Sequence, residues 1–113
     1  MRKEHNKLVR DRIPDLLRKK GIKYETCTLS TEEYRQALRQ KLMEEAQEVA
    51  EASEVNLVEE IADLFEVIDA LIEVYGIKQE EVVLAQDKKR AEKGEFREQK
   101  QLLWTQDDSS ETE

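Results

Sequence analysis

Apolar residues recur at helical spacing along two long stretches of the chain. In the first stretch, Tyr34, Leu38, Leu42, Val49 and Ala52 fall within an arc of roughly 80° on a helical wheel. The second stretch has a broader apolar face. Its members are Leu57, Ile61, Leu64, Phe65, Ile68, Leu71, Ile72 and Tyr75, and Val67 and Val74 widen it on one side. The pattern predicts two amphipathic helices.

Polar residues mark where these helices begin. Ser30 with Glu33 has the spacing of a capping box, which predicts a helix that runs to about residue 53. Asn56 with Glu59 repeats the spacing and predicts the start of the second helix. Because so few residues connect them, the two helices should pack antiparallel as a hairpin.

Glycines predict where the helices end. Gly76 is a suitable residue to end the second long helix, and a further helix over about 78–93 should end at Gly94. Near the N-terminus, Pro14 favours the first turn of a short helix that ends at Gly21. Residues 22–29 are rich in β-formers and should be extended, but one such segment makes no sheet. The predicted fold is all-α, a helical hairpin with shorter helices.

The length of 113 residues suits one domain, which we expect over residues 1–105. The acidic tail, residues 106–113, has no apolar side chains and should be disordered. The net charge of −8 argues against binding a nucleic acid polymer, whose phosphates require a basic surface. The charge does not argue against binding a phosphorylated small molecule, because a divalent cation can supply the positive charge.

Cysteine and histidine offer little chemistry. Cys27 and His5 each stand alone, so neither a disulfide within the chain nor a Cys/His metal site is expected. No apolar run reaches the length of a membrane span and no signal peptide is visible, which indicates a cytoplasmic protein without membrane contact.

Four carboxylates point toward the predicted apolar faces instead of away from them. Glu45 falls inside the arc of the first helix, and Glu48 lies on its flank. Glu60 lies inside the widened face of the second helix, and Asp63 borders it. Burying carboxylates without a counter-charge is expensive, and Lys41 can neutralise only one. Mg²⁺, which prefers oxygen ligands, could serve all four. Alternatively, these acids pair with Lys or Arg across the interface of a helical oligomer.

Three separated motifs resemble one known family. EEAQE (Glu44–Glu48) followed by EIAD (Glu60–Asp63) is similar to the EExxE and ExxD motif of the MazG-like and phosphoribosyl-ATP pyrophosphohydrolase-like superfamily. NKLVRDRIP (Asn6–Pro14) resembles a signature of its small house-cleaning NTP pyrophosphatase branch. KRAEKGEF (Lys89–Phe96) is similar to the branch's phosphate-binding stretch, although relatives often carry Gly-Gly where this chain has Gly94-Glu95.

The resemblance implies a helical, oligomeric enzyme that hydrolyses a nucleoside triphosphate to a monophosphate and pyrophosphate. Mg²⁺, with Mn²⁺ as a substitute, would be held by Glu45, Glu48, Glu60 and Asp63. Glu44 and Glu48 are the candidates for accepting the proton of the attacking water. The candidates for contacts to the polyphosphate are Lys7, Arg10, Arg12, Lys41, Lys89 and Lys93.

Two other functions remain open. A phosphoribosyl-ATP pyrophosphohydrolase would have the same metal motif, and a non-catalytic helical scaffold or regulator could keep the acidic hairpin. In each case the second helix has an apolar face that is too broad for one neighbour. Val67, Leu71 and Val74 would stay in water, so we expect at least a homodimer that completes a four-helix bundle.

Overall fold

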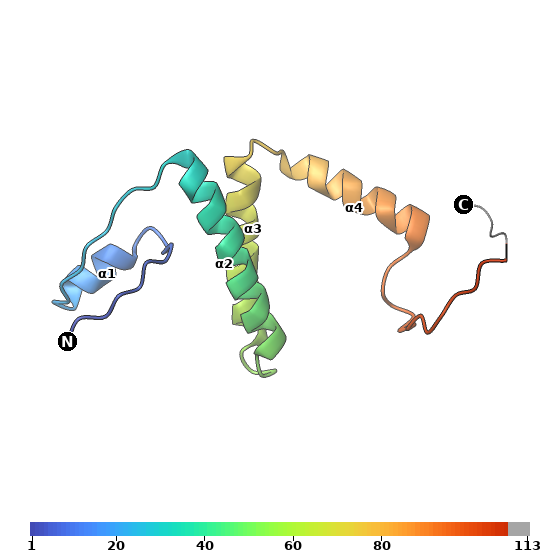
Figure 1. The fold of residues 1–113 in the computed structure, drawn as a ribbon, viewed down its shortest axis with the longest axis horizontal. Coiled ribbons are helices and arrows are strands. Elements are labelled where there is room, and N and C mark those ends of the chain that lie inside the picture. Colours follow the sequence, from blue (N-terminus) through green and yellow to red (C-terminus); the bar gives the residue numbers. More distant parts are fainter. Residues whose placement is uncertain (109–113) are drawn as a thin grey trace. The chain divides into compact units, whose positions relative to one another are not determined.

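The computed structural model describes residues 1–108, which form four α-helices and no strand (Figure 1). Residues 22–30 are neither helix nor strand. The all-α prediction is therefore confirmed. The helices are α1 (Ile13–Lys19), α2 (Thr31–Glu51), α3 (Leu57–Val74) and α4 (Gln79–Lys93).

The two long helices begin differently. The Ser30 side chain accepts a hydrogen bond of 3.1 Å from the Glu33 backbone N–H, and the Glu33 carboxylate accepts one of 3.0 Å from the Ser30 N–H. The predicted capping box of α2 is thus confirmed. The predicted box at Asn56 is wrong, because its side chain makes no capping hydrogen bond. The Asn56 N–H donates to the Ser53 carbonyl in the preceding turn, and Asn56 itself has helical backbone angles. A residue whose side chain caps a helix normally has extended backbone angles.

The end of α3 is built by a glycine and by two arginines of α2. Gly76 has a φ of +67°, which lets the Ile77 N–H donate to the Ile72 carbonyl at 2.9 Å. The Arg35 guanidinium donates to the Val74 carbonyl at 3.0 Å. It also lies 4.5 Å from the centre of the Tyr75 ring, and Arg39 donates to the Tyr75 hydroxyl. Because the last turn of α3 has no basic residue, α2 supplies the positive charge that this helix end favours.

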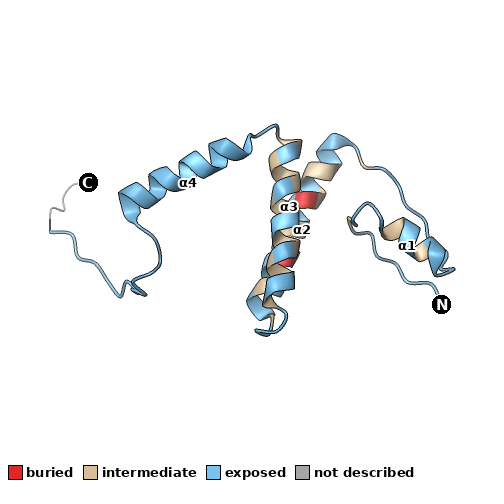
Figure 2. Cartoon of the chain, turned by 180° about the vertical axis from the view of Figure 1, so that it is seen from behind, coloured by how far each residue is buried: buried red, intermediate tan, exposed pale blue. Residues whose placement is uncertain are grey.

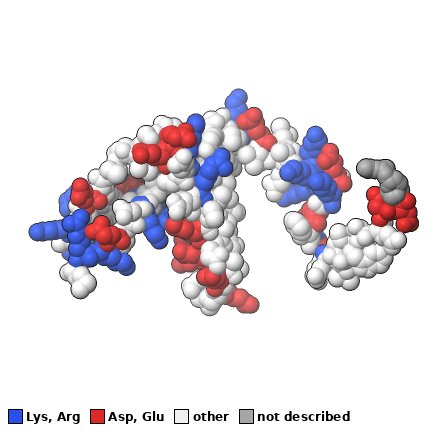
Figure 3. Space-filling view, viewed as in Figure 1, with Lys and Arg blue, Asp and Glu red and all other residues white. Residues whose placement is uncertain are grey.

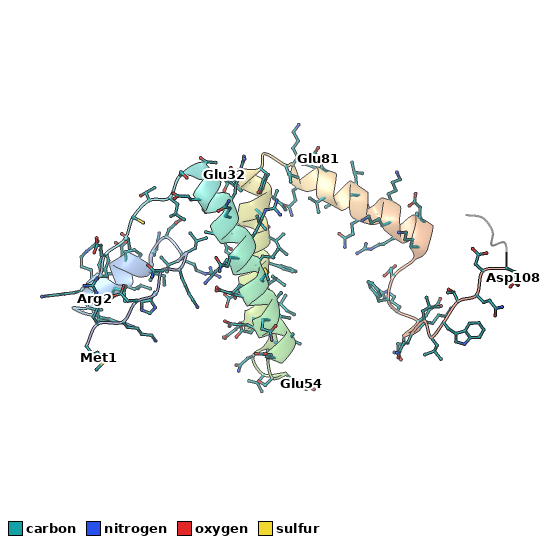
Figure 4. The ribbon with its side chains drawn as sticks, in the orientation of Figure 1. Met1, Arg2, Glu32, Glu54, Glu81 and Asp108 are labelled. Atoms are coloured by element: carbon teal, nitrogen blue, oxygen red, sulfur yellow. The ribbon has the colours of Figure 1, made fainter. Side chains whose placement is uncertain are left out.

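The core lies between α2 and α3, where Figure 2 shows the buried residues. Leu38 of α2 and Val67 of α3 are its buried apolar side chains. The other apolar residues of the predicted arc on α2, which are Tyr34, Leu42, Val49 and Ala52, are half-buried. The predicted antiparallel hairpin is therefore present, with Glu32 at the start of α2 and Glu54 at the turn (Figure 4).

The apolar residues left in water differ from those expected. Val67 is buried and Leu71 and Val74 are half-buried, because this side of α3 packs against α2. The strongly exposed apolar side chains of the two helices are instead Met43 at 72%, Val58 at 77% and Phe65 at 61%. The expectation that Val67, Leu71 and Val74 stay wet was therefore wrong. The wheel gave the width of the apolar face, but packing decides which part of it meets α2.

The chain divides into two compact units, residues 1–78 and the part that begins at Gln79. In the second unit, every residue of α4 is exposed, and so are Phe96 and Trp104. Gln106, Asp107 and Asp108 form neither helix nor strand, and the rest of the predicted disordered tail lies outside the described residues. The single domain expected over residues 1–105 remains a prediction. None of the helices described is long and apolar enough to cross a membrane.

Candidate metal centre

Carboxylates from both helices of the hairpin meet on one side of it. One oxygen atom each of Glu45, Glu60 and Asp63 lies within 4.8 Å of the other two. Glu45 is only 8% exposed, since it falls on the same arc of α2 as the buried Leu38. Glu60 and Asp63 are one turn apart on α3. Antiparallel packing therefore joins acids that are distant in the sequence.

Glu60 has the least favourable surroundings of the three acids. Its Oε1 atom is buried and has no hydrogen-bond partner. Burial raises the pKa of the Glu60 carboxyl above its usual value; the charges of Glu48, Asp63 and Glu45 and a hydrogen bond with the Glu48 side chain raise it further. Glu48 is itself exposed but thus acts on Glu60 electrostatically. Glu60 thus has like-charged carboxylates around it and a buried oxygen, Oε1, that accepts no hydrogen bond.

The oxygen atoms of the cluster fit a small divalent cation. Mg²⁺ binds oxygen ligands at about 2.0–2.1 Å in an octahedron, so opposite ligands are about 4.2 Å apart. Atoms that already lie within 4.8 Å of one another need only small side-chain rotations to reach that geometry. A cation bound by the Glu60 carboxylate would also offset the cost of its buried, unpartnered oxygen. The acidic cluster is therefore consistent with divalent metal binding.

Two lysines lie beside the cluster on the side of α2. The Lys41 Nζ atom is 3.7 Å from a carboxylate oxygen of Glu45 and 3.9 Å from one of Glu44. The Lys7 Nζ atom, from the N-terminal segment, is also 3.9 Å from Glu44. Glu44 thus lies between two ammonium groups, and its predicted role as a proton acceptor stays a prediction.

Arg10 contacts the cluster on the side of α3. Its guanidinium donates a hydrogen bond of 2.8 Å to the Asp63 carboxylate, which also makes this contact an ion pair. The sequence suggested Arg10 as a phosphate contact but gave no sign of this pairing. The two residues are 53 positions apart, and the segment before α1 has no periodicity that fixes where its side chains point.

Arg12, Lys89 and Lys93 are the other basic candidates. Arg12 precedes α1 and lines a surface hollow with Asp15 and Lys19. Lys89 lines a hollow of the second unit with Arg90 and Phe96, and Lys93 is the last residue of α4. Figure 3 shows Lys and Arg side chains gathered over the N-terminal part of the chain and over α4. Phosphate contacts of Arg12, Lys89 and Lys93 remain predictions.

Comparison with known proteins gives one match. A family model described as phosphoribosyl-ATP pyrophosphohydrolase matches residues 15–93, which include α2, α3 and α4 in full. This match covers well over half of the chain. No curated protein and no solved structure matches the chain.

Proposed function

The chain belongs to the phosphoribosyl-ATP pyrophosphohydrolase family, part of the MazG-like all-α NTP pyrophosphatases, and from this premise we propose a Mg²⁺-dependent nucleoside triphosphate pyrophosphohydrolase. The observation that carries the proposal is the cluster of Glu45, Glu60 and Asp63, in which Glu60 also has a buried carboxylate oxygen without a hydrogen-bond partner. Family membership supports a pyrophosphohydrolase. The choice of a nucleoside triphosphate, in a house-cleaning role, rests on the N-terminal NKLVRDRIP segment.

In this proposal Glu45, Glu48, Glu60 and Asp63 hold the metal. When bound, Mg²⁺ supplies positive charge to phosphate oxygens and makes a bound water easier to deprotonate. Glu44 or Glu48 accepts a proton from the attacking water. The water oxygen bonds to the α-phosphorus, and the bond from that phosphorus to the α–β bridging oxygen breaks. The products are a nucleoside monophosphate and pyrophosphate.

Basic side chains have a separate task in this mechanism. Phosphoryl transfer depends mainly on positioning and on neutralising charge, and needs no covalent nucleophile. Arg10 and Lys41 contact acids of the cluster, and Lys7 contacts the adjacent Glu44. From there they can receive the non-bridging oxygens of a polyphosphate. Arg12, Lys89 and Lys93 complete the proposed set of contacts.

A second copy of the chain is the proposed partner, because α3 has an exposed apolar surface, formed by Val58 and Phe65, that faces away from the acids. Residues two apart in a helix point about 160° apart, at about 100° per residue. On α3, Val58 is two positions from Glu60 and Phe65 is two positions from Asp63. Because Val58 and Phe65 are seven positions apart, they lie on the same face of α3. Dimerisation through this surface would bury it while leaving the acidic side open.

Phosphoribosyl-ATP is the alternative substrate, which the description of the matching family model favours. It has the same type of phosphoanhydride bond, so the metal cluster serves both reactions equally. A scaffold without activity is a weaker alternative, since all four metal positions of the motif are acidic.

The test is pyrophosphate release from a panel of nucleoside triphosphates, deoxynucleoside triphosphates and phosphoribosyl-ATP, with and without Mg²⁺. We expect release from triphosphates that requires Mg²⁺ or Mn²⁺ and is lost in Asp63→Asn. Turnover of phosphoribosyl-ATP alone would establish the alternative substrate. A folded protein that turns over none of the panel would favour the scaffold.

A further inference from the structure

The N-terminal arm, residues 1–12, contacts both helices of the hairpin, at Asp63 of the acidic cluster and at Glu44, the residue next to Glu45 of the cluster. Lys7 pairs with Glu44 of α2, and Arg10 pairs with Asp63 of α3. These two basic residues are three positions apart in the arm, yet their partners belong to different helices. Between these contacts, Leu8 is half-buried, whereas its neighbours in the arm are exposed. The arm is thus held at the site by one contact to each side of the hairpin.

Arg10 provides the positive charge at Asp63 in the absence of a metal. Its guanidinium lies 2.8 Å from an oxygen of a carboxylate that belongs to the three-acid cluster. A divalent cation bound to that carboxylate would face the guanidinium at short range, and the two positive charges would repel each other. We propose that metal binding displaces Arg10 from Asp63, so that the metal takes the place of the N-terminal arm at this carboxylate.

The exposure of the ion pair makes this exchange feasible. The side chains of Arg10 and Asp63 are 59% and 46% exposed, and ion pairs in such surroundings are weak. Lys41 differs, because it lies on α2 itself, is less exposed and contacts Glu45 within one turn. Arg10 of the arm is therefore the counter-charge that a metal can displace, whereas Lys41 stays beside Glu45.

The exchange gives Arg10 two successive roles, and the second of these rests on the proposed function. Without metal, the arginine neutralises part of the cluster and limits its self-repulsion. Once the metal has taken Asp63, the guanidinium is released beside the ion, where a polyphosphate would bring oxygens that need a second positive partner. The arm would then bind substrate only after the metal is in place.

Metal affinity measured with Mn²⁺ alone, by the EPR signal of the free ion, tests the exchange without any turnover. Removing the competing charge in Arg10→Gln should tighten Mn²⁺ binding by about two- to fivefold, the scale of an exposed ion pair. Arg2→Gln is the matched control. It removes the same charge from the same arm, where Figure 4 marks Arg2. Arg2 pairs with Glu4 at 2.8 Å and not with an acid of the hairpin. Its Mn²⁺ affinity should stay at the wild-type value.

Limited trypsin digestion provides a second readout on the intact chain. Cleavage after Arg10 should become faster when Mg²⁺ is added to the wild type, relative to cleavage after Arg2. In Asp63→Asn the ion pair that holds Arg10 is lost, so cleavage after Arg10 should be fast with or without Mg²⁺.

The outcomes separate this inference from the proposed function. Mn²⁺ binding that Asp63→Asn weakens but Arg10→Gln leaves unchanged or weakens would overturn the exchange and keep the metal site. Mn²⁺ binding that is absent, or unaffected by Asp63→Asn, would reject the metal site and the exchange together. Because the Arg10 side chain is mostly exposed, the Arg10→Gln variant should keep the wild-type helical content in circular dichroism.

Discussion

Glu48 of α2 lies close enough to Glu60 of α3 for its charge to raise the pKa of the Glu60 carboxyl. Burial of the Glu60 carboxylate acts in the same direction and is the larger cause. The two helices therefore pack with like charges facing each other, at a position where apolar residues would pack with less repulsion. Such a conflict between local stability and side-chain choice is typical of functional sites.

Replacing Glu60 with Gln should separate stability from activity. The amide keeps the shape but removes the charge that burial and three neighbouring carboxylates disfavour. In the metal-free protein we expect a melting temperature a few degrees above that of the wild type, and loss of pyrophosphate release. Glu59→Gln is the control, because Glu59 is exposed, and both properties should stay unchanged. A destabilised Glu60→Gln variant would contradict the account of repulsion.

Glu45 allows a test of metal-linked stability. In the wild type, millimolar Mg²⁺ should raise the melting temperature, and a chelator should reverse the rise, because the metal binds the folded chain alone. Glu45→Gln should abolish this rise and lower turnover by at least about 100-fold, since it removes the most buried ligand of the proposed site. Glu51→Gln, at the exposed end of the same helix, should keep both the rise and the activity.

Helical periodicity predicted the hairpin and the direction of Glu45, Glu60 and Asp63, because both depend on where a residue lies on its own helix; Glu48, on the flank of the arc, is exposed. Glu45 lies within the apolar arc of α2, and it is the most buried charged residue described. Glu60 and Asp63 share a face through their spacing alone. Because the short connection makes the two helices antiparallel, the acidic positions of α2 and α3 then lie beside each other.

Features that depend on neighbouring segments could not be predicted in this way. Asn56 has the residue type of a helix cap, but the turn before it already fixes a helical backbone. The pairing of Arg10 with Asp63 joins an arm without periodicity to a helix. Whether Val67 or Phe65 meets α2 depends on how far α3 rotates about its axis in the packed hairpin, which the wheel of a single helix leaves open.

The capping box should make stability depend on pH. Hydrogen bonds from the Ser30 backbone and side chain lower the pKa of Glu33 below its ordinary value of 4.5. The stabilisation that the charged Glu33 carboxylate gives to the folded state is therefore present above pH 4.5 and is lost as the pH falls through the lowered pKa. Urea unfolding should show Glu33→Gln less stable than the wild type at pH 7, with the difference shrinking in acid. A difference that grows toward low pH would contradict this assignment.

Lys89 and its neighbour Lys88 test the phosphate contacts proposed for α4. Lys89 lines the hollow that also contains Arg90 and Phe96, and Lys88 does not line it. Lys89→Ala should lower kcat/KM for the best triphosphate by about tenfold, the scale of one charge-assisted contact. Lys88→Ala removes the same charge one position away and should leave kcat/KM within about twofold. Equal effects of the two changes would point to overall charge instead of a specific contact.

Phe65 should decide the assembly of the protein. Phe65 is 61% exposed in the single chain and points about 160° away from Asp63 on α3. A charge at position 65 would therefore lie in the proposed interface and leave the acidic cluster unchanged. Phe65→Glu would place a carboxylate in a buried apolar contact. Light scattering should then show the 13.3 kDa monomer in place of a dimer or larger assembly. Thr31→Glu, which adds the same charge at the exposed start of α2, should keep the wild-type mass. A wild-type protein that is active as a compact monomer would refute the interface.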